Sequence, residues 1–201
     1  MGKGSSFERT MCKEFSLWWT NKERDDIFWR TSQSGGRATQ RAKSGKRTSD
    51  SYGDMMATDE DGKPLTKFIL TEFKKGYSKD LGLLIIIDGK QQVPILKGWW
   101  DKNEETRKES GRQYGVLIFQ RDYKKPCIVM DSHLFGLLES YIGEWCITDL
   151  VEISFTESVT KLVTVPLFPF FDWCSSETMR HLIEDQNTLN GSAKNKSEEE
   201  V

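Results

Sequence analysis

The 201-residue sequence lacks a long hydrophobic run. A helix that crosses a membrane needs about 20 consecutive apolar residues, whereas the longest apolar stretch here, residues 81–87, is far shorter. The first residues also lack the hydrophobic segment of a secretory signal peptide. We therefore expect a soluble, cytoplasmic protein without a membrane partner.

Closely spaced cysteines and histidines are also missing. The histidines are His133 and His181, and the cysteines are Cys12, Cys127, Cys146 and Cys174. No C-x-x-C pair occurs, so the spacing of zinc modules and disulfide frameworks is absent. We expect reduced and mostly buried thiols, and nothing in the spacing favours a cysteine–histidine nucleophile.

A net charge of −2 argues against a uniformly basic surface, but the charge is unevenly distributed. Residues 37–47 contain basic side chains and no acid, whereas residues 198–200 are all glutamate. From Gly191 onward the composition is polar and charged. Such a composition predicts a disordered acidic tail over residues 191–201.

The sequence nevertheless has enough apolar and aromatic side chains, including seven tryptophans, for one α/β domain with a sizeable core. Apolar residues at helical spacing predict a helix over residues 5–19. Ser6 would be its N-cap, and Glu8 in its first turn would suit the helix dipole. We interpret the Trp18-Trp19 and Trp99-Trp100 pairs as core residues rather than as surfaces for base stacking.

Other elements follow from composition and turn signals. We expect strands over residues 26–30, 54–57, 68–74, 114–120 and 127–131, with peripheral strands over 151–154 and 162–165. We expect helices within residues 94–112, 134–142 and 178–187, with Gly111 ending the first of them. Residues 78–92 fit either a helix or a buried strand.

A group of polar residues accompanies the predicted strand over residues 68–74. Side chains alternate along a strand, so Glu72 and Lys74 share one face while Phe73 points into the core. Asp54 adds a carboxylate from the preceding strand, which an Asp-Gly turn would join to this one as a hairpin. Two carboxylates can hold a hard cation such as Mg²⁺, and a neighbouring lysine can orient or deprotonate an attacking water.

This arrangement of Asp54 with Glu72-Phe73-Lys74 resembles the PD-(D/E)XK nuclease superfamily. Two further segments, 4–9 and 30–36, are similar to archaeal-type Holliday-junction resolvases in the same order along the chain. The first places a glutamate before an arginine on a helix, and the second is an arginine followed by a serine-glycine turn. The resemblance implies an α/β, restriction-endonuclease-like αβββαβ core with a central mixed sheet flanked by helices.

The resemblance also implies a domain organisation. One nuclease-like domain would cover residues 1–190, with a core over residues 5–135 and a C-terminal extension over residues 136–190. The segment from Arg37 to Ser51 and this extension are longer than in a compact resolvase. Both differences bear on the choice of substrate.

Catalytic roles follow from the resemblance as well. Asp54 and Glu72 would be metal ligands, with the carbonyl of Phe73 as a third, and Glu8 would contact a second metal or its water shell. Lys74 would position the nucleophilic water. The implied cofactor is Mg²⁺, for which Mn²⁺ can substitute.

Glu14 competes with Glu8 for the helix position, and the adjacent Arg9 favours Glu8. The resemblance places Arg30 and Ser34 at the phosphate of the cleaved strand. The basic segment would add salt-dependent affinity for the DNA backbone. The implied DNA-binding residues are Arg30, Ser32, Ser34, Arg37, Arg41, Lys43, Lys46 and Arg47.

The function predicted from these features is a metal-dependent DNA endonuclease that acts as a homodimer on duplex or branched DNA. Within this class, the N-terminal motifs favour a junction-resolving role over a nicking or restriction-type role. Two alternatives remain: a DNA-binding or assembly protein that keeps the fold without catalysis, and an interaction module whose basic loop binds an acidic protein. The intact acid–acid–lysine set favours the enzyme.

Overall fold

The computed structural model describes residues 3–31, 52–77, 95–146, 149–155 and 161–199. The helices are α1 (Lys3–Trp19), α3 (Lys63–Phe68), α5 (Ile95–Ser110), α6 (Ser132–Ile142), α7 (Leu167–Trp173) and α8 (Ser176–Glu199), with a 3-10 helix η1 (Glu60–Gly62). The strands are β1 (Phe28–Arg30), β2 (Met55–Ala57), β3 (Ile69–Lys75), β4 (Tyr114–Gln120), β5 (Cys127–Asp131), β6 (Val151–Ser154) and β7 (Lys161–Pro166). The ambiguous segment over residues 78–92 lies outside the described residues.

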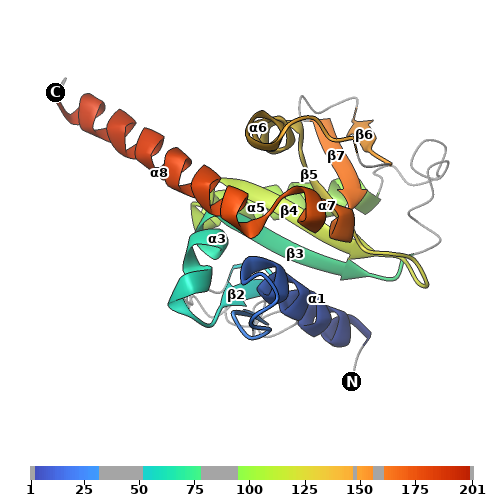
Figure 1. Ribbon diagram of the computed structural model, residues 1–201. Helices are drawn as coiled ribbons and strands as arrows, with labels where there is room; N and C mark the ends of the chain where they lie inside the picture. The colour runs from blue at the N-terminus through green and yellow to red at the C-terminus, as the bar shows by residue number, and fades with distance from the viewer. Residues whose placement is uncertain (1–2, 32–51, 78–94, 147–148, 156–160, 200–201) are drawn as a thin grey trace, which may run out of the picture.

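A five-stranded mixed sheet with the order β3-β4-β5-β7-β6 forms the centre of the molecule, and helices cover both of its faces (Figure 1). β3 and β4 are parallel, from Ile69 opposite Tyr114 to Lys75 opposite Gln120. α5 connects them, and Gly111 ends this helix with φ +70°, a value that glycine adopts readily. The expectation of a mixed α/β sheet flanked by helices is confirmed.

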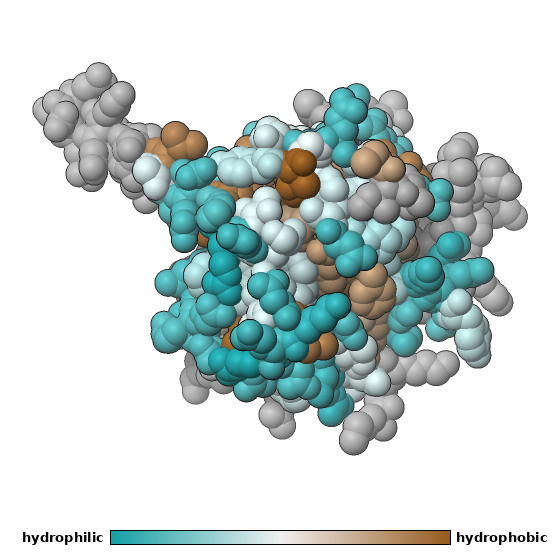
Figure 2. All heavy atoms as spheres, in the orientation of Figure 1, coloured by the Kyte–Doolittle hydropathy of each residue, from teal (hydrophilic) through white to brown (hydrophobic). Residues whose placement is uncertain are grey.

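Alternation along the strands divides the core between the two faces of the sheet. Val116 and Ile118 of β4 face the larger cluster, which α1, α3, α6, α7 and α8 cover. Leu117 faces a smaller cluster that is covered by α5 through Leu96 and Trp100. On the face shown in the space-filling view, hydrophilic side chains cover most of the described residues and hydrophobic ones are visible in smaller patches (Figure 2).

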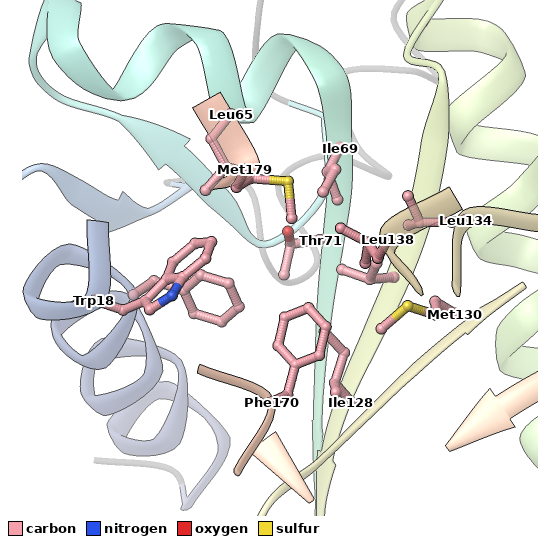
Figure 3. Close-up of a pocket in the computed structure, with 12 residues that line it drawn as sticks. Trp18, Leu65, Ile69, Thr71, Ile128, Met130, Leu134, Leu138, Phe170 and Met179 are labelled. Atoms are coloured by element: carbon pink, nitrogen blue, oxygen red, sulfur yellow. The ribbon is translucent and has the colours of Figure 1, made fainter. Parts of the chain in front are cut away.

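A small cavity remains between the sheet and the helices of the larger cluster (Figure 3). Its lining includes Trp18, Phe170 and Met179, and it is apolar apart from the side chain of Thr71. A void of this kind belongs to the packing of the core and offers no convergent polar groups for a ligand.

α1 begins earlier than predicted. The helix starts at Lys3, so Ser6 is not an N-cap and Glu8 lies beyond the first turn. The carbonyl of Ser6 instead accepts a hydrogen bond from the hydroxyl of Thr10, 3.0 Å away, as a residue inside a helix does. The helix dipole therefore does not explain Glu8. The predicted core role of Trp19 is confirmed, because this side chain is only 1% exposed.

The predicted hairpin between residues 54–57 and 68–74 is wrong. β2 pairs with β1 in a separate antiparallel ladder, with Arg30 opposite Met55. η1 and α3 occupy the connection to β3, and Pro64 lies in the first turn of α3, where its missing N–H costs nothing. The Asp-Gly pair, which predicted a tight turn, therefore lies directly before a helix that has the proline in its first turn.

The C-terminal part of the chain extends the same sheet. β7 lies between β5 and β6, and Leu162, Val163 and Val165 are buried, so the expectation of a peripheral strand is wrong for β7. β6 is the edge strand at this end of the sheet. The backbone of α8 continues to Glu199 and projects from the body, whereas the composition predicted disorder from Gly191 (Figure 1).

Among the described helices, none combines the length and the apolar character that a membrane crossing requires.

Gly115→Ala should destabilise the protein by about 1–3 kcal/mol through overpacking. A Cβ at this position would lie 2.0 Å from Oδ1 of Asn103 on α5. Asn103 is 1% exposed and donates to the carbonyl of Val116 at 3.4 Å, so it cannot move aside. Urea unfolding followed by circular dichroism measures the change.

Gly98→Ala on α5, the helix that carries Asn103, is the matched control, because a Cβ at Gly98 meets nothing within 4 Å. It should be neutral or stabilising by up to about 1 kcal/mol, the helix-propensity difference. Equal stability of the two variants would contradict close packing of α5 on β4.

Candidate active site at the edge of β3

Glu72 and Lys74 lie on the same face of β3, as the alternation of side chains predicts. Lys74 Nζ is 2.8 Å from Glu72 Oε2, and the two side chains are 23% and 18% exposed. Phe73 between them points to the opposite face, where its ring contacts Phe7 of α1 edge to face. The strand thus presents a partly buried carboxylate–ammonium pair beside α5 and a core residue beside α1.

Asp54 reaches this strand from the start of β2. It is 8% exposed, and its N–H donates to the carbonyl of Thr71 at 2.9 Å. Its Oδ2 accepts a hydrogen bond from the N–H of Phe73 at 2.8 Å. The carboxylate is therefore anchored to the backbone of the strand that carries the glutamate and the lysine.

Gly53 makes this approach possible. Its φ of +73° turns the chain directly before Asp54, and a Cβ there would lie 2.7 Å from the carbonyl oxygen of Thr71. Both the backbone angle and the lack of space exclude larger side chains. These two constraints explain why a glycine precedes Asp54.

The charges at the site are not balanced. Burial and the nearby charge of Glu72 raise the pKa of Asp54 to about 7, although the Phe73 N–H and Lys74 oppose this shift. Burial disfavours the charged form of Lys74, but Glu72, Asp54 and Tyr77 outweigh it, so the pKa of Lys74 is raised and the amine stays protonated. The two carboxylates leave negative charge that a cation would relieve.

The described residues contain no group of three or more acidic, histidine or cysteine side chains that could hold a metal. Mg²⁺ does not require such a group, because it keeps several water ligands and is usually bound by one or two carboxylates. Asp54, Glu72 and the carbonyl of Phe73 supply oxygen atoms of the kind that Mg²⁺ and Mn²⁺ prefer. These residues fit a hard divalent cation.

Glu8 and Arg30 form an ion pair beside Asp54. Arg30 Nε is 3.2 Å from Glu8 Oε2, and the side chains are 23% and 15% exposed. Of the two competing helix carboxylates, Glu8 rather than Glu14 contributes to the raised pKa of Asp54. The structure thus brings Glu8 and Arg30 to the side of the site that faces α1.

Cys12 is not an activated nucleophile, although it lies near these charges. Burial, together with the charges of Glu8 and Asp54, raises the pKa of its thiol to about 12. A thiol with such a pKa carries almost no thiolate at neutral pH. All four cysteines are free; Cys12 and Cys174 are buried, whereas Cys146 is exposed.

The other predicted DNA-binding residues lie outside the described residues. They are Ser32, Ser34, Arg37, Arg41, Lys43, Lys46 and Arg47.

Sequence reasoning missed Arg112, which lies two residues before β4 and supports the site. Its Nε donates to the carbonyl of Thr66, and its Nη1 donates to the carbonyl of Tyr52 at 3.1 Å. Tyr52 precedes Asp54 by two residues, so Arg112 fixes the chain as it enters β2. An arginine near a helix end is usually exposed to solvent, and nothing in the sequence indicates that this one bonds to distant backbone carbonyls.

A family model with the description "Phage putative PDDEXK endonuclease" matches the chain over residues 1–184. No curated protein and no solved structure matches the chain significantly. The match includes every residue of the site described above. It confirms the resemblance to PD-(D/E)XK nucleases at the level of the superfamily.

Asp54→Asn should stabilise the metal-free protein near pH 8 and reduce its pH dependence. Folding raises the pKa of Asp54 from 3.8 to about 7, so the folded state binds more protons than the unfolded state between these values. The resulting stabilisation is complete below the lower value and is lost as the pH rises through the upper one. Asparagine keeps an acceptor for Phe73 but carries no charge.

The measurement is urea unfolding in EDTA at about pH 5 and about pH 8. From the lower to the higher pH, the free energy of unfolding of the wild type should fall by on the order of 2 kcal/mol more than that of the variant. Asp149→Asn, which removes an exposed carboxylate, controls for general charge effects. Identical pH dependence of the wild type and Asp54→Asn would contradict the raised pKa of Asp54.

Proposed function

The chain belongs to the phage PDDEXK endonuclease family, and on that premise we propose that it hydrolyses DNA phosphodiester bonds in a metal-dependent reaction. The observation that carries this proposal is the convergence of Asp54, Glu72 and Lys74 at the edge of β3. Asp54 Oδ2 bonds to the Phe73 N–H at 2.8 Å, between the glutamate and the lysine. The proximity of these three side chains supports the acid–acid–lysine pattern found in the sequence.

Asp54, Glu72 and the carbonyl of Phe73 would hold Mg²⁺, with Mn²⁺ as a substitute. A divalent cation bound there lowers the pKa of a coordinated water and neutralises charge that develops on the phosphate. Asp54 must be ionised to act as a ligand. Its pKa of about 7 therefore favours activity at neutral and higher pH.

Lys74 has a separate role in the proposed reaction. Its pKa is raised, so it is a hydrogen-bond donor and a positive charge rather than a general base. As an ammonium group, it would orient the attacking water and stabilise the phosphorane-like transition state. If Glu72 bound a cation, its contact with Lys74 would weaken, and Lys74 would be able to donate to the phosphate.

Glu8 and Arg30 would act on the α1 side of the site. Glu8 holds the guanidinium of Arg30 beside Asp54, and a DNA phosphate could replace Glu8 as the partner of Arg30, since arginine binds both groups through similar hydrogen bonds. Glu8, once released, would be available to a second cation or its water shell. The resemblance to junction resolvases extends the proposal to branched DNA and to a homodimer.

Cleavage of supercoiled plasmid and of a synthetic four-way junction, with Mg²⁺ or with EDTA, tests the proposal. The wild type should cut only with Mg²⁺, and Glu72→Gln and Lys74→Met should each lower the rate about 100-fold or more, since each removes a group used in the transition state. A preference for the junction would support a resolving role.

Glu152→Gln and Lys161→Met are matched controls, because they remove an exposed glutamate and an exposed lysine from β6 and β7. Both should cut like the wild type. Absence of cutting by a folded wild type that binds DNA in EDTA would contradict the proposal and favour a non-catalytic DNA-binding protein.

A further inference from the structure

Tyr77, which follows the end of β3, contacts Trp99 of α5 and forms an aromatic pair with it. The rings of Tyr77 and Trp99 are 4.8 Å apart, centroid to centroid, in a T-shaped arrangement with an interplanar angle of 74°. Tyr77 is 46% exposed. Trp99 is partly buried, whereas its neighbour Trp100 is 5% exposed and belongs to the core. The predicted core role is therefore confirmed for Trp100, and Trp99 lies at the border of the core.

The backbone before this pair is unusual. Gly76 and Tyr77 have φ values of +98° and +60°, and a bulky residue rarely adopts a positive φ. Such strain persists where the surrounding structure holds it, and it is common at functional sites. The Gly76 N–H donates to the carbonyl of Gln120 at 2.9 Å, which fixes the turn.

The pair lies on the same face of the sheet as the catalytic lysine. Lys74 is opposite Phe119 of β4, and bridge partners project their side chains to one face. Phe119 packs against the small cluster under α5, which Trp99 also borders. Tyr77 follows Lys74 by three residues and lies close enough to contribute to its raised pKa.

A basic turn lies at the same end of the sheet. β3 and β4 are parallel, so both end on one side of the molecule, and the turn after β4 carries Arg121, Lys124 and Lys125. Lys124 and Lys125 are exposed, as is Tyr123 between the basic residues. Cations of this kind suit the phosphates that flank a cleavage site.

We propose that Tyr77 and Trp99 form a stacking site for an unpaired nucleobase next to the scissile phosphate. The inference rests on the proposed endonuclease function and narrows its substrate to DNA with unpaired nucleotides beside the cut. A T-shaped pair leaves at least one face of each ring uncovered by the partner ring. A base within a duplex is already stacked on both sides, so an unpaired base is the one that can use such a face.

Fluorescence anisotropy in EDTA tests this site separately from catalysis. The probes are one labelled oligonucleotide as a single strand and the same strand in a blunt duplex. Tyr77→Leu and Trp99→Leu should each bind the single strand about tenfold more weakly, as expected for the loss of one stacked base. Their affinity for the duplex should stay close to that of the wild type. Tyr77→Phe, which keeps the ring, should retain single-strand affinity.

Tyr141→Leu removes an aromatic side chain of similar exposure (39%) from α6 and is the control. Because Tyr77 is exposed, its variants should fold, and a melting curve verifies this. Equal losses for both probes, or no loss for either, would overturn the stacking site and leave the endonuclease proposal intact. A folded wild type that binds neither probe and cuts no DNA with Mg²⁺ would contradict the endonuclease proposal itself.

Discussion

The hydrogen bond from the Phe73 N–H to the Asp54 carboxylate is the contact on which the site depends. β3 is an edge strand, so its outer backbone groups would otherwise lack partners in the sheet. Asp54 uses two of them: its N–H bonds to Thr71, and its side chain bonds to Phe73. An edge that could pair with another chain instead receives a carboxylate beside Glu72 and Lys74.

This arrangement costs stability in the absence of a cation. Asp54 is nearly buried and lies near the charge of Glu72, which is why its pKa is raised to about 7. Gly53 and Arg112 hold the approaching chain through its backbone. The surrounding structure thus keeps two carboxylates together against their repulsion, as active sites that bind cations commonly do.

Local rules predicted part of the structure correctly. The bounds of β4 and β5 and the shared face of Glu72 and Lys74 follow from alternation and composition. The hairpin prediction failed because β2 pairs with β1, a non-local choice that turn residues do not encode. Arg112 and the contact between Tyr77 and Trp99 also depend on residues far apart in the chain, so no local pattern could reveal them.

A crystal structure of the protein grown with Mn²⁺, with an anomalous difference map, would show whether Asp54 and Glu72 share a cation. The expected result is a peak bonded to the carboxylates of Asp54 and Glu72 and to the carbonyl of Phe73, with Lys74 displaced from Glu72. An ion bound elsewhere, or an intact Glu72–Lys74 pair with no peak between the two carboxylates at saturating Mn²⁺, would contradict it.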